Sequence, residues 1–124
     1  MEVKMQAVPM LPVRDLPQAV EFYEKLGFAV DNRNDHWGWA SLSYGDCRLM
    51  LDRSIMSAHA GPRNSVVYLY PADVTEYHSA VREKGLEIPD LETTFYGMTE
   101  FRLTDPDGNN LWIGQNKADQ ERPR

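Results

Sequence analysis

The sequence predicts an α+β fold built from two tandem βαβββ modules, whose curved mixed sheets lie around a cleft. Three observations support this prediction: the chain repeats itself, each repeat carries the signals of one helix, and three short β-like runs follow each helix. With 124 residues, the chain is long enough for one domain with a real core, but too short for two independent domains.

The repeat is visible without any gap. A shift of 58 positions superposes four pairs of residues, namely Asp15 on Asp73, Leu16 on Val74, Gly27 on Gly85 and Val30 on Ile88. An apolar, β-favouring stretch precedes each aspartate. Fixed-period self-similarity of this kind indicates two copies of one supersecondary unit.

Each copy contains one amphipathic helix. Asp15 and Asp73 are typical N-cap residues, because their carboxylates accept hydrogen bonds from amides that lack a helical partner. Gly27 and Gly85 stand where a left-handed residue commonly closes a helix. Between these limits, apolar residues recur at spacings of three and four. The expected apolar positions are Leu16, Ala19, Val20, Tyr23 and Leu26 in the first copy, and Val74, Tyr77, Ala80 and Val81 in the second.

Three strands are expected after each helix. In the first copy they cover residues 28–33, 37–43 and 47–52, with Tyr44-Gly45-Asp46 as a hairpin turn. In the second they cover residues 86–91, 98–104 and 110–115, with a turn at 105–108. The single domain therefore divides into module one at about 5–52, a linker at 53–64, module two at about 65–115, and a polar, frayed tail at 116–124.

Composition excludes several classes of protein. Nineteen acidic and thirteen basic residues give a net charge of −6, which argues against a nucleic-acid partner. No apolar run approaches the roughly 18 residues that a membrane span needs. The start of the chain lacks a signal-peptide core, and the single Cys47 cannot form an internal disulfide. We therefore expect a cytoplasmic protein without a membrane partner.

Three stretches of sequence resemble a known superfamily. They cover residues 13–28, 44–51 and 95–108, including the run Phe22-Tyr23…Leu26-Gly27-Phe28 and the later Asp105-Pro106-Asp107-Gly108. Together they resemble the vicinal oxygen chelate superfamily of glyoxalases, extradiol dioxygenases and bleomycin-resistance proteins. The resemblance extends over roughly Met5 to Gln115. Its character is nearest to the bleomycin-resistance branch, and it implies a homodimer.

The metal ligands of this superfamily have no counterparts here. The resemblance implies ligands, usually His and Glu, on the first and fourth strand of each half. The matching positions are Val8, Leu49, Val66 and Trp112, and none of these side chains binds a cation. Their sequence neighbours also lack His, Glu, Asp and Cys. The sequence therefore predicts no metal and no other cofactor.

Strand alternation predicts which side chains line the cleft. A shift of 63, which superposes Gly45 on Gly108, matches Trp37 to Glu100 and Trp39 to Arg102. Phe95 and Tyr96 are expected to close one side. The predicted ligand-binding residues are Met10, Trp37, Trp39, Leu49, Tyr68, Tyr96, Glu100, Arg102 and Trp112. A structural alternative remains open, in which the aromatic residues only fill a core and Glu100 and Arg102 only pair with each other.

The leading hypothesis is a metal-free protein that sequesters a flat, aromatic and possibly cationic small molecule, as the bleomycin-resistance branch does. Aromatic walls suit stacking, and an acidic chain suits a cation. A second hypothesis is an enzyme of the superfamily, of lyase, isomerase or dioxygenase type. It would work without a metal, with Glu100 as a general acid or base and Arg102 holding an anion, or with a non-standard metal site.

Overall fold

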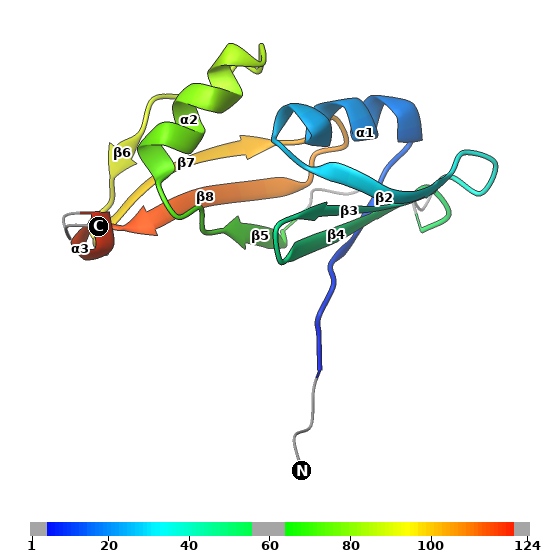
Figure 1. The fold of residues 1–124 in the computed structure, drawn as a ribbon, viewed down its shortest axis with the longest axis horizontal. Helices are drawn as coiled ribbons and strands as arrows, with labels where there is room; N and C mark the ends of the chain where they lie inside the picture. Colours follow the sequence, from blue (N-terminus) through cyan, green and yellow to red (C-terminus); the bar gives the residue numbers. More distant parts are fainter. Residues whose placement is uncertain (1–4, 56–63, 121–124) are drawn as a thin grey trace. The chain divides into compact units, whose positions relative to one another are not determined.

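A computed structural model of the chain describes residues 5–55 and 64–120 (Figure 1). The chain divides into two compact units, Met1–Ala60 and Gly61–Arg124. Each unit contains a four-stranded mixed sheet and a ten-residue helix. The predicted α+β class and the tandem modules are therefore confirmed.

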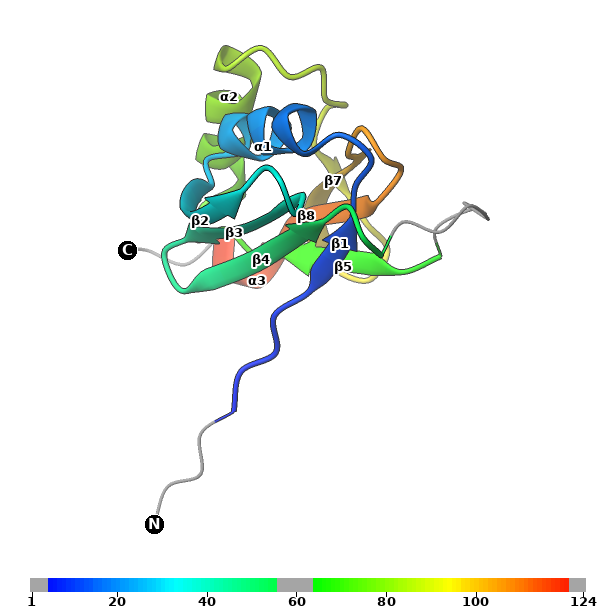
Figure 2. The ribbon, with the colours of Figure 1, turned by 90° about the vertical axis from the view of Figure 1, so that its right-hand side faces the viewer.

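The first unit has the strand order β1-β4-β3-β2. Its elements are β1 (Met10–Pro12), α1 (Leu16–Lys25), β2 (Ala29–Asn34), β3 (Trp39–Tyr44) and β4 (Cys47–Asp52). Strand β1 runs parallel to β4, as Figure 2 also shows, while β2, β3 and β4 form an antiparallel meander. Helix α1 lies over one face of this sheet and contacts β2, β3 and β4.

The second unit repeats this topology with the order β5-β8-β7-β6. Its elements are β5 (Val66–Leu69), α2 (Val74–Glu83), β6 (Glu92–Thr93), β7 (Met98–Thr104), β8 (Asn110–Asn116) and α3 (Lys117–Gln120). Strand β5 is parallel to β8, and β6, β7 and β8 are antiparallel. The core of this unit lies between α2 and the sheet, where Phe101, Leu111 and Ile113 are buried.

The helix signals are confirmed at both ends. The side chains of Asp15 and Asp73 accept hydrogen bonds from the amides of Gln18 and Glu76, each at 3.0 Å. Gly27 and Gly85 follow the last helical residues with φ values of 98° and 95°, a conformation that disfavours any residue with a Cβ atom. These caps limit both helices to ten residues, which fixes where the chain returns to the sheet in each unit.

The face predicted for α2 needs one correction. Ala80 is exposed, whereas His78 is buried beside Phe101, with the two ring centroids 4.9 Å apart. The Nε2 atom of His78 lies 2.7 Å from the carbonyl oxygen of Pro89. His78 is thus part of the core of the unit, and it fixes the segment that follows the helix.

The strand predicted at residues 86–91 is wrong. Among the described residues only Glu92 and Thr93 form the short edge strand β6. The carbonyl of Ile88 instead accepts a hydrogen bond from Arg82 at 2.9 Å, and the Pro89 carbonyl is paired with His78. Pro89 also lacks the amide hydrogen that a paired strand requires. Side chains of α2 therefore satisfy this segment in place of a neighbouring strand.

Residues 116–120 differ from the prediction of a frayed tail. Asn116 is the last residue of β8, and Lys117–Gln120 form α3. Gln120 accepts a hydrogen bond from Thr99 at 2.7 Å and donates one to Thr75 at 3.0 Å, which ties α3 to β7 and α2. Most of the predicted linker, and the last four residues of the predicted tail, lie outside the described residues. No helix of the described chain is long and apolar enough to cross a membrane.

Candidate functional site

Strands β5, β7 and β8 present polar and aromatic side chains on the face of the second sheet that α2 does not cover. Tyr68 and Arg102 are both register partners of Trp112, so the three residues form one row across the sheet. Their neighbours Phe101, Leu111 and Ile113 point to the opposite, buried face. We call the side that carries Tyr68, Tyr70, Glu100, Arg102 and Trp112 the aromatic face.

Arg102 lies over the ring of Trp112 at the middle of this face. Its guanidinium carbon is 3.5 Å from the centroid of the indole ring, which is a close cation–π contact. The ring of Tyr68 meets the same indole edge-on, with centroids 5.9 Å apart. Tyr70 stacks on Tyr68 at 4.7 Å, although 68% of Tyr70 is exposed. Aromatic surface thus extends from the centre of the sheet to the end of β5.

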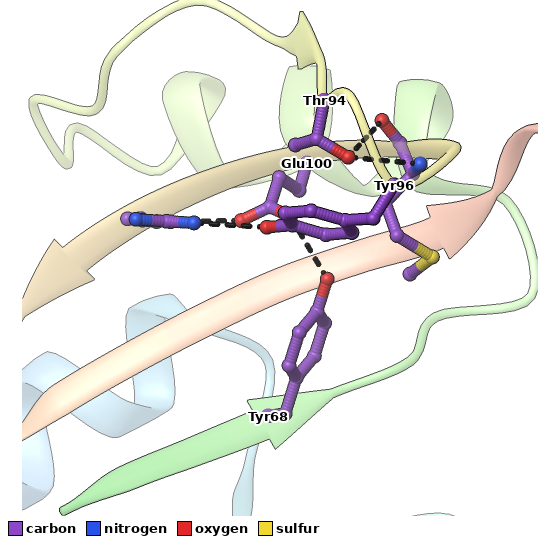
Figure 3. A network of polar contacts seen from close by, with 6 residues as sticks. Tyr68, Thr94, Tyr96 and Glu100 are labelled. Carbon is purple, nitrogen blue, oxygen red and sulfur yellow. Dashed lines mark hydrogen bonds and ion pairs between the residues drawn. The ribbon is translucent and has the colours of Figure 1, made fainter.

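Glu100 is fully buried beneath these side chains and accepts three hydrogen bonds (Figure 3). Its Oε1 atom accepts from the hydroxyls of Tyr68, at 3.0 Å, and of Tyr96. Its Oε2 atom accepts from Nε of Arg102 at 2.8 Å. The hydroxyl of Tyr96 in turn accepts from Nη2 of Arg102 at 2.8 Å. One buried carboxylate therefore fixes two tyrosines and an arginine.

The charges of the network follow from these contacts. Burial by itself would raise the pKa of Glu100, but hydrogen bonds from Tyr96, Arg102 and Tyr68 outweigh burial and lower that pKa below its ordinary value. Burial, together with the hydrogen bond to Glu100, raises the pKa of Tyr68. The hydrogen bond to Glu100 raises the pKa of Arg102. At neutral pH Glu100 and Arg102 therefore form an ion pair, and the Tyr68 hydroxyl keeps its proton.

Gly114 gives Tyr68 its access to Glu100. Tyr68 lies on β5 and Glu100 lies on β7, the strands on either side of β8. Gly114 lies on β8 and is the register partner of Glu100. A Cβ atom at position 114 would lie 2.8 Å from Cβ of Glu100, 3.1 Å from the carbonyl oxygen of Thr99 and 3.2 Å from the hydroxyl of Tyr68. Only a residue without a side chain leaves room for the hydroxyl to cross the strand.

Tyr96 comes from the turn between β6 and β7, which is closed by Thr94. The Thr94 hydroxyl accepts from the amide of Met98 at 3.0 Å, and the Thr94 amide donates to the Met98 carbonyl at 2.8 Å. Figure 3 shows Tyr96 directed from this turn toward Glu100. Phe95 points away and is 100% exposed. Phe95 and Tyr96 were both expected to close one side of the site. Tyr96 points into the site as expected, whereas Phe95 points outward.

Five predicted residues gather on this face or at its side: Tyr68, Tyr96, Glu100, Arg102 and Trp112. Tyr70 and Gly114 also belong to this side of the sheet but are not among the predicted ligand-binding residues. Strand alternation does turn Tyr70 to the same side as Tyr68, and it would have found Gly114 as well, because Gly114 is two residues beyond Trp112. Nothing in the sequence indicated that the missing side chain at Gly114 lets the Tyr68 hydroxyl reach Glu100.

The four predicted residues of the first unit do not form one group. Met10, which is 42% exposed, is the register partner of Met50, and Trp39 shares their face of the sheet. Leu49 does not, because it is fully buried with Leu51 on the face that α1 covers. The predicted inward orientation of Leu49 is therefore wrong. Met50 is the residue that corresponds to Trp112, since it pairs with β1 as Trp112 pairs with β5.

Trp37 is also misplaced by the sequence prediction. Strand β3 begins at Trp39, and Trp37 lies in the preceding turn, where its amide donates to the side chain of Asn34 at 3.0 Å. The indole is 69% exposed. Trp39 keeps its predicted face, although its counterpart in the second sheet is Glu100 and not Arg102.

The metal of the superfamily does not fit the donors on these sheet faces. Of the positions that the resemblance assigns to metal ligands, Val8 precedes β1, Leu49 is fully buried, Val66 begins β5, and Trp112 lies on the aromatic face under Arg102. The nearby carboxylate of Glu100 is already hydrogen-bonded to three partners. Within the described ranges, no three His, Cys, Asp or Glu side chains gather as a metal site would require.

A hollow lies elsewhere on the surface of the second unit. It runs along α2, has a volume of about 510 Å³, and is lined by Asp73, Thr75, Glu76, Ser79, Ala80 and Glu83. Its carboxylates come from α2 and from Asp73, the residue before α2, and none of the lining residues is aromatic. The aromatic face is the better candidate for recognition of an organic ligand.

The fold and this site define a class of protein: tandem βαβββ units, with an aromatic face on the sheet of the second unit. The family model of the Glyoxalase/Bleomycin resistance protein/Dioxygenase superfamily matches residues 6–113. The chain belongs to this superfamily. The resemblance noted in the sequence is thereby confirmed.

Three relatives show which members the chain is similar to. A bleomycin resistance protein of Klebsiella pneumoniae is 32% identical over 126 residues, covering 90% of this chain and 93% of that protein. The crystal structure of a bleomycin-binding protein complexed with bleomycin is 29% identical, with a TM-score of 0.75, over 91% of this chain and 99% of that one. A bleomycin resistance determinant encoded on the transposon Tn5 has 29% identity and a TM-score of 0.76, over 92% of this chain and 99% of that one.

Proposed function

We propose that this protein binds bleomycin, and that it protects by capturing the drug in stoichiometric amounts, without making or breaking a bond. One observation carries the proposal: a bleomycin-binding protein, solved with bleomycin, shares the fold with a TM-score of 0.75 and 29% identity over 91% of this chain. The bleomycin resistance protein of Klebsiella pneumoniae, at 32% identity, supports the same ligand.

The aromatic face supplies the chemistry that such binding needs. Tyr70, which is 68% exposed, offers π surface beside Tyr68 at the end of β5, and the Arg102 guanidinium over Trp112 offers a flat surface at the centre of the sheet. Flat rings gain from stacking or edge-on contact with both kinds of surface. We therefore propose that a flat aromatic part of the ligand stacks here. The net charge of −6 favours approach of a ligand with positive charge elsewhere on its frame.

The alternative of an enzyme with Glu100 as its base is disfavoured by geometry. The carboxylate is fully buried, its pKa is lowered, and hydrogen bonds already occupy both of its oxygens. A general base must reach the proton that it removes and must have a pKa near the working pH. Cys47 is no better as a nucleophile, since burial raises the pKa of its thiol.

Isothermal titration of the purified protein with metal-free bleomycin tests the proposal. We expect saturable binding to the wild type, at one drug per site, and a loss of about tenfold or more in affinity for Trp112→Ala, because that variant removes the indole on which Arg102 rests and which Tyr68 contacts. Phe22→Ala is the matched control: it removes a half-buried aromatic residue from α1, and its affinity should equal that of the wild type.

Two outcomes would contradict capture of the drug. The first is the absence of saturable binding by the wild type at drug concentrations up to about 100 µM, far above a useful dissociation constant. The second is a change in the mass of the drug after incubation with the protein, measured by mass spectrometry, since a captured ligand leaves unaltered.

We further propose that the protein is a homodimer. The resemblance to the bleomycin-resistance branch supports this state, and the fully exposed Phe95 of the second unit is an aromatic side chain that a partner chain would cover. Light scattering on the eluting protein should give a mass near twice 14.3 kDa. A mass of one chain at all concentrations would contradict the dimer.

A further inference from the structure

Arg102 is held in place before any ligand binds. Its Nε atom donates to Glu100 at 2.8 Å, its Nη2 atom donates to Tyr96 at 2.8 Å, and its guanidinium carbon lies over the ring of Trp112. A free arginine side chain would lose rotamer entropy on binding a ligand, but this one has lost it on folding. The guanidinium is therefore a fixed, directed donor.

Part of that donor is unused. The side chain of Arg102 is 43% exposed, and within residues 5–55 and 64–120 no acceptor is bonded to its Nη1 atom. The planar guanidinium is suited to acceptors in its own plane and to stacking of a flat group on its open surface. A planar group with an oxygen at its edge would satisfy both features at once.

The charge arrangement adds selectivity. The negative partner, Glu100, lies underneath and is fully buried, while the positive partner lies at the surface. A ligand therefore meets the guanidinium and not the carboxylate. A cationic group placed here would face a like charge with no access to Glu100, which is a repulsive element that specific sites commonly use.

We propose that Arg102 is a specificity-determining residue of the aromatic face. It selects a planar ligand group that carries an anionic or carbonyl oxygen, and it excludes a cationic group from the same position. Tyr96, Glu100 and Gly114 act as positioning residues that hold the guanidinium over Trp112. The location of the site depends on the proposed function, but the selectivity does not depend on bleomycin being the ligand.

Two fluorescent probes separate the acceptor from the aromatic frame. 1-Anilinonaphthalene-8-sulfonate carries a sulfonate, and N-phenyl-1-naphthylamine has the same rings without it. Both should be titrated against the protein in about 0.15 M salt, where the Debye length of about 8 Å screens the net charge of the chain. We expect the sulfonate probe to bind the wild type more tightly than its neutral counterpart.

The variants then assign that preference to the guanidinium. Arg102→Met should weaken binding of the sulfonate probe about tenfold or more and change binding of the neutral probe less than about twofold, because only the charged hydrogen bond is lost. Arg102→Lys keeps the charge but loses the planar fork, so its affinity for the sulfonate probe should lie between those of the wild type and Arg102→Met. Arg33→Met is the matched control, since Arg33 also pairs with an acid two residues away, at Asp35.

A second variant guards against a folding defect. Arg102→Met leaves the buried Glu100 without its cation, whereas Glu100→Gln combined with Arg102→Met removes both charges and should retain the fold and the loss of preference. Equal binding of the two probes by the wild type would overturn the proposal. So would a parallel loss of both probes in the folded double variant. If the probes behave as expected and bleomycin does not bind, the proposed drug is wrong and the selectivity stands.

Discussion

The guanidinium of Arg102 and the indole of Trp112 are register partners on neighbouring strands, and the carbon of the first lies 3.5 Å from the ring centroid of the second. Directly opposed residues of an antiparallel pair point to the same side of the sheet, so the register itself brings the cation over the ring. Glu100, two residues earlier on β7, then fixes the plane of the guanidinium.

Gly114→Ala should destabilise the protein by about 1–3 kcal/mol, because the new methyl group overlaps Glu100, Thr99 and the Tyr68 hydroxyl. The urea midpoint would report the change. Thr104→Ala, at an exposed position of β7 in the same sheet, is the control and should stay within about 0.5 kcal/mol of the wild type. A Gly114→Ala variant as stable as the wild type would show that the Tyr68–Glu100 contact does not need the gap.

Glu100→Gln should change how stability depends on pH. The folded state lowers the pKa of this carboxyl below its ordinary value, so its contribution is fully present above the unfolded pKa and is lost as pH falls through the folded pKa. Melting temperatures between about pH 6 and pH 3 should therefore fall less steeply for Glu100→Gln than for the wild type. Near pH 7 the variant should be less stable by about 1–3 kcal/mol, since a charged hydrogen bond is weakened. Parallel pH profiles would contradict the assignment.

Leu49→Ala and Met50→Ala test which face of β4 is buried. Loss of the fully buried Leu49 should destabilise the protein by about 2–5 kcal/mol through the cavity that it leaves. Loss of Met50, which is half-buried on the opposite face, should cost less than Leu49→Ala by about 1 kcal/mol or more. Denaturant unfolding of both variants gives the comparison, and the reverse order would restore the orientation predicted from sequence.

His78→Ala should loosen the segment of residues 86–91. The variant removes the partner of the Pro89 carbonyl and the edge contact with Phe101, so we expect a loss of about 1–3 kcal/mol. Hydrogen exchange of the amides in this segment should quicken at the same time. Ser79→Ala, exposed on the same helix, should change neither quantity. Unchanged exchange in His78→Ala would mean that Arg82 alone fixes the segment.

Much of the fold could be predicted because its signals are local. Asp15 and Asp73 begin the helices, and Gly27 and Gly85 end them, since these residues act on backbone groups within one turn of themselves. Alternation on β7 also placed Glu100 and Arg102 on one face and Phe101 on the other. Assigning residues to the two faces of β7 requires only the two-residue period of a strand.

The errors arise where distant segments decide the outcome. Residues 86–91 combine β-favouring side chains with Pro89, and their carbonyls bond to His78 and Arg82 from the preceding helix. Alignment of the turn glycines matched Leu49 of the first unit to Trp112 of the second. The two hairpin connections differ in length, so the true alignment of β4 with β8 is shifted by one residue, and Met50 is the residue that matches Trp112. A shift of one residue in a strand exchanges its two faces.

The sequence by itself determined the two modules, their helices and turns, and the presence of aromatic and charged residues on β5, β7 and β8, because each of these depends on residues near one another in the chain. Only the tertiary structure decided that Glu100 is covered, that Tyr96 returns from a turn to meet it, and that Gly114 leaves the space for Tyr68. Those contacts join three strands and a loop, and the strand register that creates them is set by packing of the whole sheet.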